Sequence, residues 1–189
     1  MTSLFEHPGV GYQWGAVVGA SLVAAFWDWR CRRIPNLLTG PLLVAGLASA
    51  VWAGGWWGLT DACVACIMLA FPYVLLFVFA GGGAGDAKMM GAVGAWLGST
   101  QGVVVLVAVV VVGCVMGLAL ACLGRRRALI WRNLGLIAFS IYYVACSPGR
   151  VKQLKTLLPA PAQSQAMPYG LAICGGVVLG GGVLWIWPL

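Results

Sequence analysis

Residues 87–123 form one apolar run in which Lys88 is the only charged side chain. As a single helix this run would be about 55 Å long, whereas the hydrocarbon core of a bilayer is about 30 Å thick. The run must therefore break, and the segment GSTQG at residues 98–102 is its only polar stretch. This predicts a short membrane span over residues 87–97 and a long, valine-rich span over residues 103–123.

Apolar stretches of similar character recur along the rest of the chain. Hydrophobic residues make up 62% of the sequence and charged residues only 8%, whereas charged residues make up about a quarter of a typical soluble domain. We therefore predict an all-α, polytopic membrane bundle of about six transmembrane helices, built as a single domain over residues 1–189. The four further spans are expected at residues 12–27, 37–57, 60–80 and 169–187.

The basic residues fall in short segments between the apolar runs, and this distribution sets the expected orientation. It is typical of loops held on the cytosolic face of a membrane, so no nucleic acid partner is expected despite the net charge of +7. Segment 128–147 leaves two paths open. If it crossed the membrane, the basic residues at 150–155 would lie on the opposite side from those at 125–127. We favour an interfacial or re-entrant path, which keeps every basic residue cytosolic.

The four acidic residues separate into two groups under this topology. With both termini outside, Glu6 and Asp61 lie outside, and Asp28 and Asp86 are the two acids left at the cytosolic side. Asp86 begins the short fourth span, which covers only about 18 Å, so it is expected below the membrane surface. Acids at such depth are costly and mark functional sites. Structural roles are the alternative: Asp86 could cap a helix, and Asp28 could pair with Arg32 at i+4.

Histidine-dependent catalysis is nearly excluded by composition. His7 is the only histidine and lies near the chain end, so a serine or cysteine nucleophile has no histidine base. Cys63 and Cys66 form a CxxC pair inside an apolar span, whereas a structural zinc site usually has four ligands. We interpret these two cysteines as packing residues. Neither a metal nor a cofactor is expected.

Two neighbouring carboxyl groups, by contrast, can hydrolyse a peptide without a metal or a histidine. They share one proton and titrate as a unit. The charged member takes a proton from water, and the neutral member donates one to the scissile carbonyl or to the leaving amine. Glycines at 81–83 and 85 leave the backbone bare beside Asp86, so an extended substrate strand could approach closely.

Three motifs resemble those of the type IV prepilin peptidases. Residues 28–36, DWRCRRIPN, resemble the first-aspartate motif D-x-R-x-x-x-I-P-N of that family. Residues 83–88, GAGDAK, resemble its GxGD-x-K motif, and residues 167–170, MPYG, are similar to the P-[FY]-G stretch that opens its last helix. The three occur in the family's order, each at an expected cytosolic boundary, and together they span most of the chain.

The resemblance implies an aspartic endopeptidase of the bacterial inner membrane, with its active site toward the cytosol. It implies that Asp28 and Asp86 catalyse removal of the basic leader from prepilins, after a glycine. Prepilins would be the substrates, the lipid bilayer the surroundings, and pilus or secretion assembly proteins further partners. The remaining motif residues are expected to bind substrate or shape the site: Arg32, Pro35, Asn36, Gly83, Gly85, Lys88, Pro168, Tyr169 and Gly170.

The resemblance is closest to the short, Tad/Flp-type members, which lack the N-terminal methyltransferase domain. Longer members carry paired CxxC motifs in a cytosolic domain, whereas this sequence has a single CxxC inside an apolar span. Methylation of the new terminus is therefore not expected.

Two other functions compete with this interpretation. Presenilin-type intramembrane proteases also use GxGD, but they carry a Tyr-Asp and a Pro-Ala-Leu motif where this chain has Trp27 before Asp28 and a Pro-Tyr-Gly sequence at 168–170. A transporter, or a non-catalytic assembly factor of a pilus or secretion system, is the other alternative. Transporters tend to show inverted repeats with acids near the bilayer midplane. This chain shows no convincing repeat, and both acids are expected near one edge.

Overall fold

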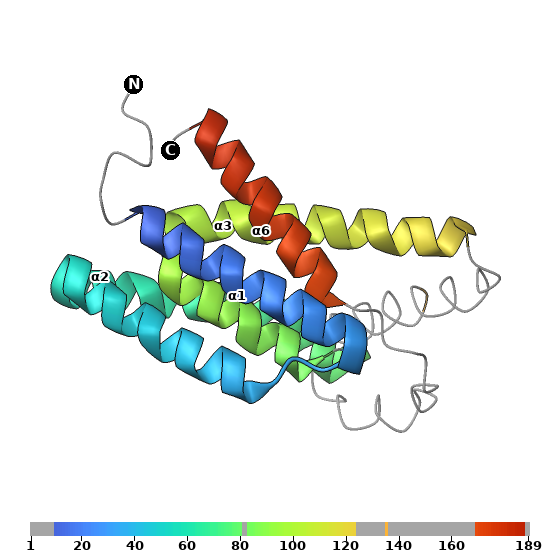
Figure 1. Cartoon of the computed structure of the whole chain (residues 1–189), viewed down its shortest axis with the longest axis horizontal. Helices are drawn as coiled ribbons and strands as arrows, with labels where there is room; N and C mark the ends of the chain where they lie inside the picture. The colour runs from blue at the N-terminus through green and yellow to red at the C-terminus, as the bar shows by residue number, and fades with distance from the viewer. Residues whose placement is uncertain (1–9, 81–82, 124–134, 136–168, 188–189) are drawn as a thin grey trace, which may run out of the picture.

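The computed structural model describes residues 10–80, 83–123, 135 and 169–187, and all regular secondary structure within these ranges is α-helical. The helices are α1 (Val10–Cys31), α2 (Asn36–Ala80), α3 (Ala84–Leu123) and α6 (Tyr169–Ile186), arranged as a bundle in Figure 1. The prediction of an all-α fold is confirmed. Segment 128–147, apart from residue 135, lies outside the described residues.

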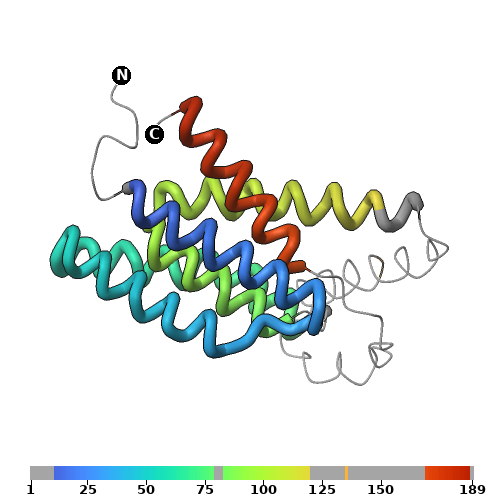
Figure 2. The backbone as a smooth tube through the Cα atoms, viewed as in Figure 1, coloured from blue at the N-terminus to red at the C-terminus, as the bar shows by residue number. Residues whose placement is uncertain are grey.

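The two longest helices each turn at a single glycine. Gly55 in α2 has φ 58° and ψ −139°, and Gly98 in α3 has φ 71° and ψ −177°. Glycine has no Cβ and adopts positive φ without steric cost. Figure 2 shows both helices changing direction sharply along their length. The break expected within residues 98–102 therefore lies at the first residue of that segment.

The number of separate helices differs from the prediction of about six transmembrane helices. The described residues form four helices, and three of them are long and apolar enough to cross a membrane: α2, α3 and α6. The count is lower because no loop separates the spans predicted at 37–57 and 60–80, nor those at 87–97 and 103–123. Helix α1 is not among the three, and its last turns carry Asp28 and Arg30.

The turn in α3 is held by an acid from α2. The Asp61 carboxylate accepts a hydrogen bond from Ser99 N at 3.1 Å and another from the Ser99 hydroxyl. Backbone N–H groups at the start of a helical segment have no partner within that segment. Asp61 supplies one from a neighbouring helix, and it approaches Gly98 so closely that a Cβ there would meet its carboxylate. The second half of α3 is therefore capped by a side chain from another helix of the same chain.

Small residues let the helices approach closely. A Cβ on Gly94 of α3 would lie 2.6 Å from the backbone oxygen of Ala65 in α2. A Cβ on Gly176 of α6 would meet the backbone of Val109 in α3. Such contacts are typical of helices packed in membranes, where side-chain fit replaces the hydrophobic effect. The core around them contains Leu69, Met89, Met90, Val93, Val105, Ile173 and Val177.

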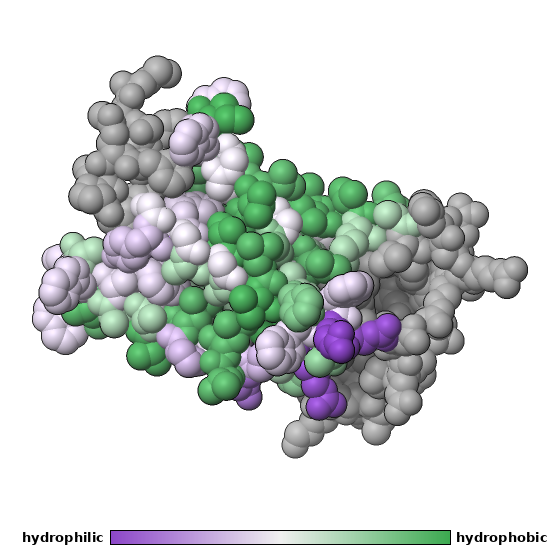
Figure 3. Space-filling model, viewed as in Figure 1, coloured by the Kyte–Doolittle hydropathy of each residue, from purple (hydrophilic) through white to green (hydrophobic). Residues whose placement is uncertain are grey.

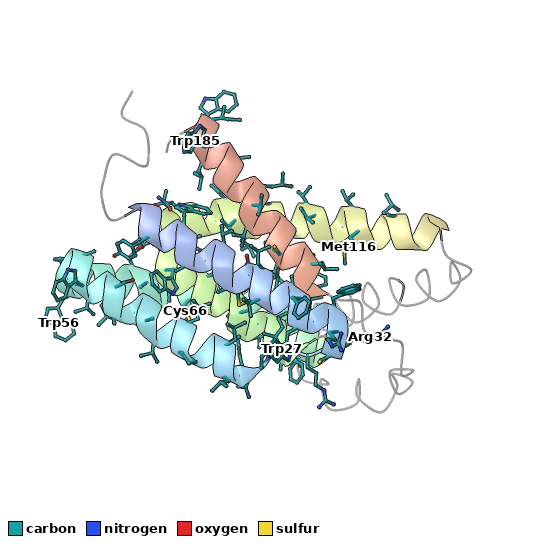
Figure 4. The ribbon with its side chains drawn as sticks, in the orientation of Figure 1. Trp27, Arg32, Trp56, Cys66, Met116 and Trp185 are labelled. Atoms are coloured by element: carbon teal, nitrogen blue, oxygen red, sulfur yellow. The ribbon has the colours of Figure 1, made fainter. Side chains whose placement is uncertain are left out.

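The outer surface of the bundle is apolar, as a bilayer-facing surface must be. Figure 3 shows hydrophobic residues along the helices and the strongly hydrophilic ones gathered toward one end. Exposed tryptophans mark the opposite end, among them Trp52, which is 92% exposed, and Trp56 beside the turn of α2. Figure 4 shows Trp56 far from Trp27 and Arg32. Aromatic belts of this kind are typical of the two membrane interfaces.

The close packing of α6 on α3 leads to a stability prediction. We expect Gly176→Ala to lower the free energy of unfolding by about 1–3 kcal/mol, because the new methyl group meets the Val109 backbone, which cannot rotate away. Gly182 lies on the same helix, and a Cβ added there would have no atom within 4 Å, so Gly182→Ala should be neutral. Thermal unfolding in one detergent, followed by tryptophan fluorescence, compares the two variants. Equal stability would contradict the close approach.

Candidate active site

Asp28 lies near the end of α1 and is buried, with 6% of its surface exposed. Its Oδ2 accepts a hydrogen bond of 2.7 Å from the backbone N–H of Gly170. Gly170 is in the first turn of α6, where N–H groups have no partner within the helix. A Cβ at Gly170 would lie 2.8 Å from Asp28 Cβ and 3.0 Å from Oδ2. The carboxylate thus caps α6, and only glycine allows this approach without displacement.

Asp86 lies in the first turn of α3 and is half-buried. Its backbone N–H donates to the Gly83 oxygen at 3.2 Å, and a Cβ on Gly83 would lie 2.6 Å from Asp86 Oδ2. Asp28 is near enough to Asp86 for the two carboxyl groups to interact electrostatically. Acids 58 positions apart in sequence, one near the end of α1 and one in the first turn of α3, therefore lie within electrostatic range of each other.

Arg32 does not pair with Asp28 in the way that a continuing helix would allow. Helix α1 ends at Cys31, and Arg32 has a positive φ of 52°. Among the described residues, the contact between Arg32 and Asp28 is a backbone hydrogen bond, from Arg32 N to Asp28 O at 2.8 Å, and not an ion pair. The structural alternative for Asp28, a side-chain pair with Arg32, is therefore wrong.

Two tyrosines lie beside the acids. The rings of Tyr73 in α2 and Tyr169 in α6 meet edge to face, with centroids 6.0 Å apart and an interplanar angle of 75°. Both tyrosines interact electrostatically with Asp86. Tyr169 belongs to the third sequence motif, but Tyr73 was missed by sequence reasoning. Its only sequence signal is a polar hydroxyl within the apolar run at 60–80.

The first two motifs also pack against each other. Lys88 Nζ donates a hydrogen bond of 2.9 Å to Asn36 Oδ1, and a Cβ on Gly85 would lie 3.1 Å from Ile34 Cβ. The Pro35 oxygen accepts a hydrogen bond from Leu38 N at 3.0 Å at the start of α2. These contacts join the turn after α1 to the start of α3. Pro168 of the third motif lies outside the described residues.

A cavity of about 450 Å³ lies between α2 and the start of α3, and Ala87, the residue after Asp86, is one of its lining residues. Its walls are mostly apolar, with Asn36 and Lys88 among the polar lining residues and Cys66 from the CxxC pair. Cys63 is exposed and does not line the cavity. Within the described part of the chain, no group of three or more histidine, cysteine or acidic residues is placed to hold a metal ion.

This arrangement can support acid–base chemistry on a peptide bond. Two carboxyl groups in a poorly hydrated place cannot both carry charge without a large cost, so a shared proton is favoured. In one step, a charged carboxyl can then take a proton from water while a neutral carboxyl donates one to the scissile carbonyl. The hydrogen bond from Gly170 holds the Asp28 carboxyl group, and the Gly83 oxygen holds the backbone N–H of Asp86.

Comparison with known proteins is in line with the motifs. The model of the type IV leader peptidase family matches residues 16–121, a range that contains both acids and ends before α6. Two curated proteins of Burkholderia pseudomallei, from strains 1026b and K96243, are each named prepilin leader peptidase/N-methyltransferase and are 32% identical to this chain over 132 residues. The similar region is 66% of this chain and 42% of each relative. No solved structure matches the chain.

Proposed function

The chain belongs to the type IV leader peptidase family, and from this premise we propose that it is a membrane aspartic endopeptidase that removes the basic leader from type IV, Flp-like prepilins. The observation that carries the proposal is the pair formed by Asp28 and Asp86, which interact electrostatically at the junction of α1, α3 and α6. No third acid among the described residues lies with them, since Asp61 is bound to Ser99. The relatives' name also includes methylation, which the proposal does not extend to this chain.

In this mechanism the two acids activate water together. The charged carboxyl takes a proton from the attacking water, while the neutral carboxyl donates its proton to the oxygen of the scissile carbonyl. When the carbon–nitrogen bond breaks, the first carboxyl passes its new proton to the leaving amine, and the second regains its proton from the hydroxyl group formed on the carbonyl oxygen. The pair thereby returns to its starting state. Both acids are assigned as catalytic residues, and neither is fixed as the base.

The remaining motif residues shape this site in the proposal. Gly83 and Gly85 keep the backbone beside Asp86 bare, so that an extended substrate can approach. Lys88 and Asn36 bind each other across the start of α3 and line the neighbouring cavity. Arg32 and Pro35 form the turn between α1 and α2, and Tyr169 and Gly170 open α6.

We further propose that α2 and α3 each cross the membrane twice, so that residues 1–189 form one membrane-embedded peptidase domain with about six crossings. Helix α2 has 45 residues, about 68 Å if straight, which is roughly twice the thickness of a bilayer core. Gly55 and Gly98 would lie at the outer face of the bacterial inner membrane, next to the exposed tryptophans. The acids would then lie toward the cytosol, beside the basic turn at 30–33.

Leader removal is the direct test of the proposed function. We expect the protein, co-expressed with a Flp-type prepilin, to convert that prepilin to a faster-migrating form on a denaturing gel. Mass spectrometry of the product should place the new N-terminus directly after the basic leader. The same prepilin expressed alone should stay unprocessed. An intact prepilin beside a membrane-inserted enzyme would overturn the assignment.

A further inference from the structure

One polar group beside the acids has no role in the mechanism above. Tyr73 is 5% exposed, and its hydroxyl is buried with no hydrogen-bond partner among the described residues. Leaving a buried hydroxyl unpaired costs about 1–3 kcal/mol. Phenylalanine would fill the same space without that cost, so packing alone does not explain a tyrosine here. Buried polar groups without partners are rare and call for a specific explanation.

The position of Tyr73 connects it to both acids. Its ring packs edge to face on Tyr169, the residue before the Gly170 whose N–H binds Asp28. It also interacts electrostatically with Asp86. The next residue, Val74, lines the neighbouring cavity, as does Ala87, which follows Asp86. Tyr73 therefore lies within electrostatic range of Asp86, on a helix whose next residue lines the cavity.

We propose that the Tyr73 hydroxyl is a further catalytic group, which donates a hydrogen bond to the carbonyl oxygen of the scissile peptide bond. This inference rests on the proposed function, because it requires a peptide substrate at the acid pair. Among the described residues the hydroxyl has no hydrogen-bond partner, and in this proposal the substrate carbonyl is the acceptor it lacks. A donor fixed in advance in a site poor in water stabilises charge that develops on the carbonyl oxygen.

The chemical step is balanced without a proton from the tyrosine. The oxygen of water forms a bond to the carbonyl carbon as the charged carboxyl takes one water proton. The π electron pair of the carbonyl moves to its oxygen, which accepts the proton of the neutral carboxyl and keeps the hydrogen bond from Tyr73. The carbon–nitrogen bond then breaks, and the nitrogen takes the proton held by the first carboxyl. The hydroxyl group formed on the former carbonyl oxygen returns its proton to the second carboxyl. The net change is one water added across one peptide bond.

Tyr73→Phe tests this role because it removes the hydroxyl and keeps the ring. We expect kcat for leader cleavage in detergent or proteoliposomes to fall by roughly 100-fold, the effect of losing one donor to a developing oxyanion. KM should stay within about twofold, because the bond strengthens mainly in the transition state. Thermal stability should stay the same or rise, since an unpaired buried hydroxyl is lost. Tyr12→Phe is the matched control, since Tyr12 packs on Trp96 instead of Tyr169 and is 46% exposed.

The outcomes separate this inference from the proposed function. A kcat within about twofold of wild type for Tyr73→Phe, with wild-type cleavage intact, overturns the role of Tyr73 and leaves the peptidase assignment standing. A lower kcat that comes with lost thermal stability, or a raised KM with unchanged kcat, also overturns it in favour of packing or ground-state binding. Wild-type protein that does not cleave prepilin overturns the proposed function itself.

Discussion

Asp28→Asn and Asp86→Asn should each reduce leader cleavage by about a thousand-fold or more, the size of loss seen when one member of a cooperating catalytic group is removed. An amide has nearly the shape of a carboxyl group but can neither take a proton from water nor carry the shared proton. The measurement is the rate of prepilin conversion by purified enzyme, quantified from gels at equal enzyme concentration. The double variant should be no slower than either single variant, because the two acids act as one unit.

Two further variants make this result specific. Asp61→Asn changes an acid at the other end of the bundle and keeps an oxygen that can accept from Ser99 N, so it should cleave at nearly the wild-type rate. Lys88→Ala should weaken cleavage less than either acid variant. The Lys88 side chain binds Asn36, and its link to the acids is only that it lies on the same helix as Asp86. If Asp28→Asn or Asp86→Asn cleaves normally while remaining in the membrane, the pair is not catalytic.

Span length alone predicted that the long apolar run at 87–123 breaks. The side-chain contacts that stabilise this break could not be predicted from the sequence. The apolar run at 87–123 is too long for one crossing, so a break near residue 98 followed from elementary geometry. The acid that holds that break is Asp61, which lies 38 residues before Ser99. Such a pair depends on how α2 packs on α3, and no local pattern reports it. For the same reason the turn of α2 falls at Gly55, a few residues before the predicted end of a span.

The residues of the candidate active site also divide into those that the sequence identified and those that only packing revealed. Asp28 and Asp86 stood out because charge is rare in this sequence and each acid lies in a recognisable motif. Tyr73 did not, because one hydroxyl in an apolar helix carries no spacing signal, and only packing brings it to Asp86. Arg32 was expected on the face of Asp28, but a positive φ after Cys31 turns the chain away. Sequence therefore identified the charged groups, and tertiary packing decided their neighbours.

Gly170→Ala should reduce leader cleavage by roughly 100-fold while leaving the protein folded. The added methyl group would lie 2.8 Å from Asp28 Cβ and 3.0 Å from Oδ2, so the carboxyl must move. A displacement of about 1 Å in a catalytic group can cost about 100-fold in rate. The movement would also strain the 2.7 Å hydrogen bond that Gly170 N–H donates to Asp28. The effect is on position, because both acids keep their chemistry.

The same helix supplies the comparisons that interpret this variant. Gly182→Ala adds a methyl group where no atom lies within 4 Å, so both its cleavage rate and its thermal stability should match the wild type. Gly176→Ala should lower the thermal stability, because its new methyl group meets the Val109 backbone and not the Asp28 carboxyl group. Rates are best compared at a temperature well below the unfolding midpoint of all three variants. Wild-type cleavage by Gly170→Ala would show that the contact between α6 and Asp28 does not set the geometry of the pair.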